Sequence, residues 1–248
     1  VQHWVPGLTT EDKKMITSGG WLSDEIVDAG QKLLKSMYPH IQGLQEVALG
    51  MVLSYSIAKS EFIQIMNTGK HHWVTVSNIN CNDEEIHVYD CASGSPTSSL
   101  LNQIASIVCT PKDIIKLTYI DVQMQQGCDD CGLFAIAFAT SLARGEQPGS
   151  FFYQQKAMRK HLVDCLEKQN ITAFPIQKIR RHGSKVRHSA NIPIHCVCRL
   201  PKLEGIKMIE CSYCGTWYHI DLCVSVSADS QQPHTKWACV RCKSWTDN

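Results

Sequence analysis

A cysteine between an acidic loop and an apolar run is the first residue whose setting suggests chemistry. Residues 125–132 read Gln-Gln-Gly-Cys-Asp-Asp-Cys-Gly, and the apolar residues 133–139 follow at once. The apolar run predicts a helix that begins near Cys131, with Asp129 or Asp130 as its N-cap. The dipole and the unpaired N–H groups at a helix start favour a thiolate and lower the pKa of a cysteine there. Cys131 is therefore a candidate nucleophile.

A thiolate nucleophile also needs a base. His72 opens a predicted strand over residues 72–79, and Asp90 ends another over 85–90. If these strands are neighbours, Asp90 can hold the imidazole tautomer while His72 takes the thiol proton. His71 is the competing base. A single cysteine with a distant histidine is by itself weak evidence for catalysis.

The oxyanion of an acyl-transfer reaction needs hydrogen-bond donors. Gln125 lies six residues before Cys131, and its side-chain amide can donate together with the backbone N–H of Cys131. Gln126 is adjacent and could take the same role.

The elements that must position these residues follow from hydrophobic spacing. Helices are predicted from Ser23 to Tyr38-Pro39, over 98–109 and over 153–167. Strands are predicted over 62–66, 72–79, 85–90 and 115–124. Helices packed on a small sheet give an α+β domain.

Several short motifs, taken together and in this order, resemble the ubiquitin-like-protein proteases, the SUMO-protease or Ulp family. They are Trp21-Leu22-Ser23-Asp24-Glu25, His72-Trp73, Tyr89-Asp90, Gln125 and Gly127-x-x-Asp130-Cys131-Gly132. Ser23 stands where the family has asparagine. The resemblance covers about residues 1–170 and implies a papain-like cysteine peptidase fold of the Ulp type.

The resemblance also implies roles for particular residues. Cys131 would be the nucleophile, with His72, Asp90 and Gln125 as its partners and no catalytic cofactor. Trp21 and Trp73 would enclose a narrow tunnel that only a Gly-Gly C-terminus can pass. The implied activity is cleavage after the Gly-Gly of a ubiquitin-like modifier, in maturation or deconjugation. Without the motifs, the two tryptophans would be interpreted as core aromatics.

A second chemical pattern lies near the C-terminus. Seven cysteines and one histidine there have metal-ligand spacing: Cys196, Cys198, Cys211, Cys214, His219, Cys223, Cys239 and Cys242. Two tetrahedral zinc sites need eight such ligands. Because so short a segment buries little apolar surface, we expect two structural Zn²⁺ ions to supply its folding energy.

This pattern resembles a PHD finger, through its Cys-x-Cys start and the run Trp217-Tyr218-His219. The resemblance implies a cross-brace, with one zinc on Cys196, Cys198, His219 and Cys223 and the other on Cys211, Cys214, Cys239 and Cys242. The gap from His219 to Cys223 is one residue longer than usual. PHD fingers imply a histone tail or other peptide as partner. Trp217 and Met208 match methyl-lysine cage positions, and Lys202 would repel a trimethylammonium.

Charge divides the chain in two. Residues 1–175 have a net charge of −5 and residues 176–248 one of +6. We therefore predict a peptidase domain over 1–172, a basic linker over 173–194 and a finger over 195–244, so that residues 1–175 should be active alone. The linker, with Lys178, Arg180, Arg181, Lys185 and Arg187, is interpreted as a solvated spacer. A nuclear-localisation or nucleic-acid patch is the alternative.

The distribution of cysteines indicates the kind of cellular compartment in which the protein works. Six of the 13 cysteines are scattered through residues 1–175 at spacings that suggest no disulfide pairs. This favours a reducing compartment over a disulfide framework. No signal peptide and no membrane span are expected. The chain is expected to be intracellular and nuclear. Because the chain begins with Val1, we expect it to be an excerpt of a longer protein. Fusions of this kind resemble mobile-element-derived proteins, which implies a non-standard role in the host.

Two rival functions stay open at the level of sequence. The chain could be a chromatin or protein adaptor that keeps a silent peptidase fold, or a cysteine acyltransferase on the same fold. The intact set His72, Asp90, Gln125 and Cys131 argues against the adaptor. Gln125 and the pair Trp21 and Trp73 favour hydrolysis over acyl transfer. The sequence leaves open which modifier is cut and what the finger binds.

Overall fold

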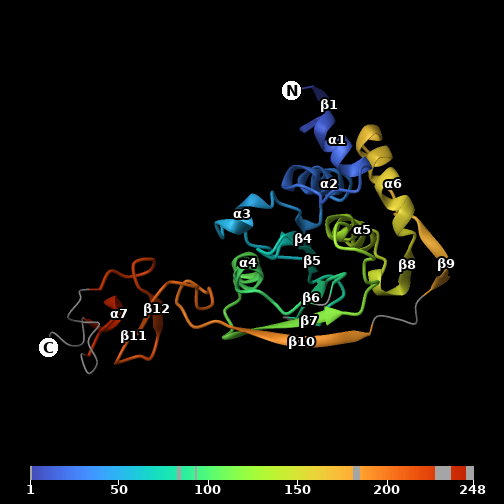
Figure 1. Ribbon diagram of the computed structural model, residues 1–248. Helices are drawn as coiled ribbons and strands as arrows, with labels where there is room; N and C mark the ends of the chain where they lie inside the picture. Colours follow the sequence, from blue (N-terminus) through green and yellow to red (C-terminus); the bar gives the residue numbers. More distant parts are fainter. Residues whose placement is uncertain (1, 83–84, 93, 181–184, 227–235, 244–248) are drawn as a thin grey trace.

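The computed structural model describes residues 2–82, 85–92, 94–180, 185–226 and 236–243. Its centre is a six-stranded sheet in the order β10-β7-β6-β5-β4-β3 (Figure 1). The strands are β3 (Gln42–Gly43), β4 (Phe62–Asn67), β5 (Trp73–Ser77), β6 (Glu85–Tyr89), β7 (Ile114–Ile120) and β10 (Val186–Pro193). β4, β5 and β6 are antiparallel neighbours, β6 and β7 are parallel, and β10 is antiparallel to β7.

The sheet has a core on each face because successive strand side chains point to opposite sides. In β4, Ile63 and Ile65 join one hydrophobic cluster, whereas Phe62 and Met66 join the other. The first cluster also holds side chains of four helices: α1 (Thr10–Thr17), α2 (Asp24–Met37), α5 (Cys131–Ala143) and α6 (Gln155–Lys168). The second cluster is covered by α4 (Ser98–Val108).

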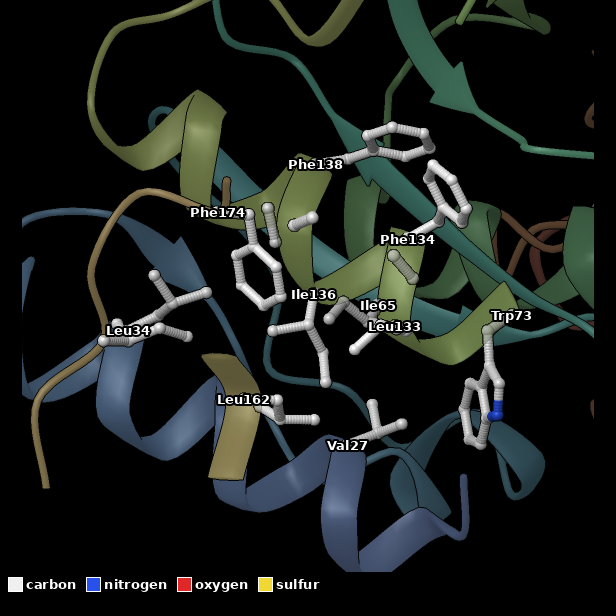
Figure 2. Close-up of a cluster of buried hydrophobic side chains, with 14 of the residues drawn as sticks. Val27, Leu34, Ile65, Trp73, Leu133, Phe134, Ile136, Phe138, Leu162 and Phe174 are labelled. Atoms are coloured by element: carbon white, nitrogen blue, oxygen red, sulfur yellow. The ribbon is translucent and has the colours of Figure 1, made fainter. Parts of the chain in front are cut away.

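Helix α5 is the central element of the first core. All 13 of its residues are buried, so it has no solvent face. Figure 2 shows Phe134, Ile136 and Phe138 among side chains from the surrounding elements, including Leu34 and Leu162. α5 is also tied to the sheet, because the Thr75 hydroxyl donates to the Ala135 carbonyl at 2.7 Å. A helix that is apolar all round is held by its surroundings on every side.

Shorter elements complete the peptidase part. They are β1 (His3–Val5), β2 (Leu8–Thr9), α3 (Ala48–Met51), η1 (Pro148–Ser150), β8 (Phe151–Tyr153) and β9 (Ile176–Arg180). A capping box between Thr9 and Asp12 starts α1, a helix that the sequence interpretation missed. The predicted α+β class is confirmed, and every predicted helix and strand is present with shifted ends.

The interpretation of residues 173–194 as a solvated spacer is wrong. β9 pairs with β8, and β10 pairs with β7 along its whole length. Ile192 and Ile194 are buried in the second core. The basic, polar composition of residues 173–194 suggested a spacer because an edge strand buries only part of its surface and so keeps many polar residues. Arg181, one of the five basic residues, lies outside the described residues.

The finger follows β10 without a break. It contains β11 (Met208–Glu210), β12 (Trp217–His219) and α7 (Val240–Lys243), and lies beyond the end of β10 in Figure 1. Arg199 holds it to the peptidase part by donating from Nε to the Thr110 carbonyl at 2.8 Å and from Nη2 to the Lys112 carbonyl. Within the described residues, no helix is long and apolar enough to span a membrane.

Candidate active site and metal centres

Cys131 is the first residue of α5 and is buried at the edge of the core. This placement agrees with the predicted helix start, but the predicted cap does not form. Asp130 occupies the N-cap position without a side-chain capping bond. Its carboxylate bonds instead to Arg159 of α6, at 2.8 Å from Nε and 2.5 Å from Nη2, and to Gln155 Nε2 at 2.5 Å. Side chains of α6 therefore hold the loop before Cys131 in place.

His72 and Asp90 meet at one edge of the sheet, as expected for ends of neighbouring strands. His72 immediately precedes β5 and Asp90 immediately follows β6. His72 Nε2 lies 2.7 Å from Asp90 Oδ1, which also accepts from the Ala92 N–H at 2.8 Å. Since Nε2 is engaged by Asp90, Nδ1 is the ring nitrogen available for Cys131.

The electrostatics of the pair favour thiolate and imidazolium. Burial acts to lower the pKa of His72, but hydrogen bonds with Asp90 and Cys131 outweigh it and raise that pKa to about 9. Burial acts to raise the pKa of Cys131, but hydrogen bonds with His72 and the Trp73 N–H outweigh it and lower that pKa. Both shifts act toward thiolate and imidazolium, the protonation states that a cysteine nucleophile and its acid–base partner need.

The two candidate oxyanion donors have different settings. Gln125 is half-buried, and its Oε1 accepts from the Asp130 N–H at 3.2 Å. That bond leaves the Nε2 hydrogens to donate elsewhere. Gln126 is exposed, and its backbone N–H and C=O are both bonded to the Gln155 side chain. Of the two, Gln125 is the one whose side chain is bonded to the residue directly before Cys131.

The two tryptophans stack beside Cys131. Trp21 and Trp73 have ring centroids 5.4 Å apart and an angle of 19° between planes. Trp73 is buried and donates from Nε1 to the Leu22 carbonyl at 3.1 Å, whereas Trp21 is half-buried. A Cβ atom on Gly132 would lie 3.0 Å from the Trp73 ring and 3.1 Å from Leu22 Cβ. A side chain at position 132 would therefore require the Trp73 ring or Leu22 to shift by a few tenths of an ångström.

His71 does not take part in the Asp90 pair. It is exposed, has a left-handed backbone (φ 50°) and packs edge-on against Trp21, with ring centroids 5.7 Å apart. The structure thus brings His72, Asp90, Cys131 and Gln125 together and leaves His71 and Gln126 outside that group.

The eight predicted metal ligands form two clusters. Cys196, Cys198, His219 and Cys223 make one, and Cys211, Cys214, Cys239 and Cys242 the other, with the ligand atoms of each within 4.8 Å of one another. This is the predicted cross-brace, including Cys223. The Sγ atoms of Cys196 and Cys223 are 3.6 Å apart and those of Cys214 and Cys239 3.8 Å apart. Tetrahedral Zn–S bonds of about 2.3 Å require a similar separation, so the residues fit zinc.

The outer contacts of His219 support the same conclusion. Its Nε2 lies 3.0 Å from the Pro201 carbonyl, which fixes the proton on that nitrogen. Nδ1 is then the free ligand atom, and it lies 3.4 Å from Cys198 Sγ and 3.8 Å from Cys223 Sγ. A backbone carbonyl behind a metal-binding imidazole is the usual arrangement.

A groove of about 1230 Å³ runs beside β11. Its lining includes the three residues that the sequence related to a methyl-lysine cage, Lys202, Met208 and Trp217, together with His195. Trp237 also lines it while packing edge-on against Tyr218 with centroids 5.3 Å apart. Trp237 is therefore shared between the finger core and the groove.

Comparison with known proteins decides the family. Residues 54–181 match the Ulp1 protease family, C-terminal catalytic domain, which is about half of the chain. The chain belongs to the Ulp1 protease family. Residues 196–242 match the PHD finger. The Ulp1 match contains His72, Trp73, Asp90, Gln125 and Cys131.

Solved structures agree on the peptidase fold. The C-terminal Ulp1 protease domain in complex with Smt3, the yeast orthologue of SUMO, is 17% identical, with a TM-score of 0.52, covering 65% of this chain and 83% of that one. The SUMO protease Ulp1 with its catalytic cysteine oxidised to a sulfinic acid is 18% identical, with a TM-score of 0.50, covering 65% and 84%. At these identities the likeness shows the Ulp1-type fold.

Curated relatives match over a short part of the chain. The histone lysine demethylase PHF8 and the lysine-specific demethylase phf2 of Danio rerio are each 37% identical over 54 residues. That span is 22% of this chain and 5% of each relative. The matched part is therefore a small fraction of those proteins.

The sequence interpretation of this Ulp1-family chain missed two contributors to the site. Arg159 and Gln155 hold the loop before Cys131, but they lie on a helix 24 or more residues away in sequence. An arginine and a glutamine four residues apart on a predicted helix do not indicate, in the sequence, that they contact a distant loop. Gly132 stood in the quoted motif, and its close approach to Trp73 supplies the physical reason for it.

Proposed function

We propose that the chain is a cysteine peptidase that cleaves after the C-terminal Gly-Gly of a ubiquitin-like modifier. The observation that carries the proposal is the hydrogen-bonded chain from Asp90 through His72 to Cys131, with thiolate and imidazolium both favoured. Gln125 lies beside it on the loop that leads to the nucleophile. Each group has the chemistry that its step requires.

The reaction would proceed in two halves. The Cys131 thiolate attacks the carbonyl carbon of the terminal glycine, and the oxyanion that forms accepts from the Gln125 amide and the Cys131 N–H. The His72 imidazolium then gives its proton to the leaving amine as the C–N bond breaks. Water, deprotonated by His72, cleaves the resulting thioester. Asp90 holds the ring in the orientation that both transfers need.

Specificity for glycine would come from Trp21 and Trp73. The rings are in van der Waals contact, with centroids 5.4 Å apart, so a peptide backbone can pass between them only if they separate. Trp73 is buried and bonded to the Leu22 carbonyl, so Trp21 is the ring that must move. A side chain on either of the last two substrate residues would meet an indole face. Alanine in place of Gly-Gly should therefore abolish cleavage.

Modifier-derived probes test this function. The chain would be incubated with ubiquitin, SUMO and other modifiers that carry an electrophile at the Gly-Gly terminus, and adducts mapped by mass spectrometry. One modifier should label Cys131, and Cys131→Ser should lose the label while staying folded. The exposed Cys128 provides the matched control, so Cys128→Ser should label normally. Labelling that persists in Cys131→Ser would refute the assignment.

We further propose that each four-ligand cluster binds one structural Zn²⁺. Thiolates and an imidazole at tetrahedral spacing favour zinc over hard cations. Metal analysis of the purified chain should give two zinc ions per chain. The finger should lose its structure on treatment with a chelator, because the ions supply its folding energy.

The groove beside β11 is proposed to bind a peptide such as a histone tail. β11 pairs on one side with β12, and Trp217 is 37% exposed at the groove. Lys202 in the lining disfavours a trimethylated lysine, because like charges repel. Titration with unmodified and trimethylated histone peptides should show no preference for the trimethylated form. Trp217→Ala should weaken whichever peptide binds.

The domain limits and the location follow from the same observations. Because β10 belongs to the peptidase sheet, we place the peptidase at 2–194 and the finger from 195 onward. The predicted last finger residue, 244, lies outside the described residues. A 54-residue match to histone demethylases favours a nuclear location, and microscopy of the tagged protein would test it.

A further inference from the structure

Oδ2 of Asp90 faces Arg187, a basic residue of β10, which lies beyond the residues 54–181 that match the Ulp1 protease family. Asp90 Oδ1 is occupied by His72 and by the Ala92 N–H. Oδ2 lies 3.9 Å from Nη2 of Arg187, which belongs to β10. The Asp90 side chain is 5% exposed and that of Arg187 is 20% exposed, so little water separates the two charges.

An irregularity in β10 aims Arg187 at the site. Val186 pairs with Ile120 and His188 with Tyr119, so two steps along β10 match one step along β7. Arg187 is the extra residue of this bulge. A bulge redirects the side chain it carries, and such bulges are common beside active sites. Here it lets a residue two strands away from β6 reach Asp90.

The same guanidinium holds the turn that follows Asp90. Nη1 of Arg187 donates to the Ala92 carbonyl at 3.2 Å and lies 3.4 Å from Met124 Sδ. The N–H of Ala92 in turn donates to Asp90. Within the described part of the chain, Nε and Nη2 of Arg187 are buried without a hydrogen-bond partner. A buried cation with unused donors is costly unless a nearby anion compensates it, and Asp90 is that anion.

We propose that Arg187 is a positioning residue of the peptidase. By balancing the charge on Oδ2 of Asp90 and fixing the turn at Ala92, it keeps Oδ1 directed at His72. The proposal rests on the proposed peptidase function. By this proposal β10, the strand that leads into the finger, contributes a residue that positions Asp90.

The test compares full-length variants. Arg187→Met removes the charge and the donors at similar length, Arg187→Gln keeps an amide donor without the charge, and Arg187→Lys keeps the charge. Lys185→Met is the matched control, because it removes the same charge from an exposed side chain two residues earlier. Cleavage of a modifier substrate gives kcat and KM, and thermal unfolding is recorded for each variant.

We expect Arg187→Met and Arg187→Gln to lower kcat by about 10- to 100-fold, the scale of a small misplacement of a catalytic group. KM should stay within about twofold, because substrate contacts are unchanged. Arg187→Lys should recover most of kcat, and Lys185→Met should resemble the wild type. Wild-type kcat in both uncharged variants would overturn the proposal. So would a loss of kcat in Arg187→Lys as large as in Arg187→Gln.

A second readout separates this proposal from the peptidase function. The rate at which iodoacetamide alkylates Cys131 reports thiolate formation, and mass spectrometry resolves it from the other cysteines. It should fall in Arg187→Gln and recover in Arg187→Lys even if no modifier substrate is cleaved. If wild type cleaves a substrate and all Arg187 variants alkylate equally, the peptidase function stands and the role of Arg187 is refuted.

Discussion

Replacing Ile192 with alanine should destabilise the peptidase domain by about 2–5 kcal/mol. Ile192 has no exposed surface and packs in the second core opposite Ile115 of β7. The substitution removes three buried carbons. At about 0.8 kcal/mol each, their lost transfer energy alone is about 2.4 kcal/mol. The cavity left behind accounts for the remainder.

The assay is thermal and urea unfolding of the full chain with zinc present. For a domain of this size, 1 kcal/mol lowers Tm by about 2–4 °C, so the expected drop is roughly 5–20 °C. Ile114→Ala is the matched control, because Ile114 lies opposite Pro193 in the same strand pair but is 48% exposed. Its effect should stay within about 0.5 kcal/mol.

Truncation extends the same reasoning. A chain ending at residue 175 loses β9 and β10, uncovers the edge of β7 and exposes apolar core beneath Ile192 and Ile194. It should aggregate or lack activity, whereas a chain ending at 194 should fold. Equal stability of the two fragments, together with an unchanged Tm in Ile192→Ala, would refute the claim that β10 is part of the domain.

Three other outcomes are expected. Gln125→Ala should lower kcat by about 10²–10³, whereas Gln126→Ala should leave it unchanged. Single-turnover cleavage measures both, and the reverse result would assign the oxyanion donor to Gln126. Cys223→Ser should reduce the zinc content from two ions per chain to one by metal analysis, and retention of both ions would remove Cys223 from the ligands. Because the pKa of His72 is raised to about 9, the stability from its protonated form should be complete below its ordinary pKa of 6.5 and lost as pH rises through about 9. Unfolding measured from pH 6 to 10 should show this loss in wild type but not in His72→Ala.

Much of the site could be predicted from the sequence because its signals are local. Cys131 stands at the start of an apolar helix, and His72 and Asp90 stand at strand ends whose alternation is readable. The spacing of the finger ligands likewise predicted two four-ligand clusters, because metal coordination imposes close pairs along the chain.

The tertiary structure decided what depends on segments far apart in the chain. Residues 186–193 have the composition of a spacer, and only pairing with β7 makes them a strand. Asp130 could cap its own helix, yet Arg159 draws its carboxylate away because a charged pair outweighs a cap in a half-buried setting. Arg187 reaches Asp90 only through a bulge two strands away. Local spacing encodes periodicity and caps, whereas such contacts arise when the sheet order brings distant side chains to one edge.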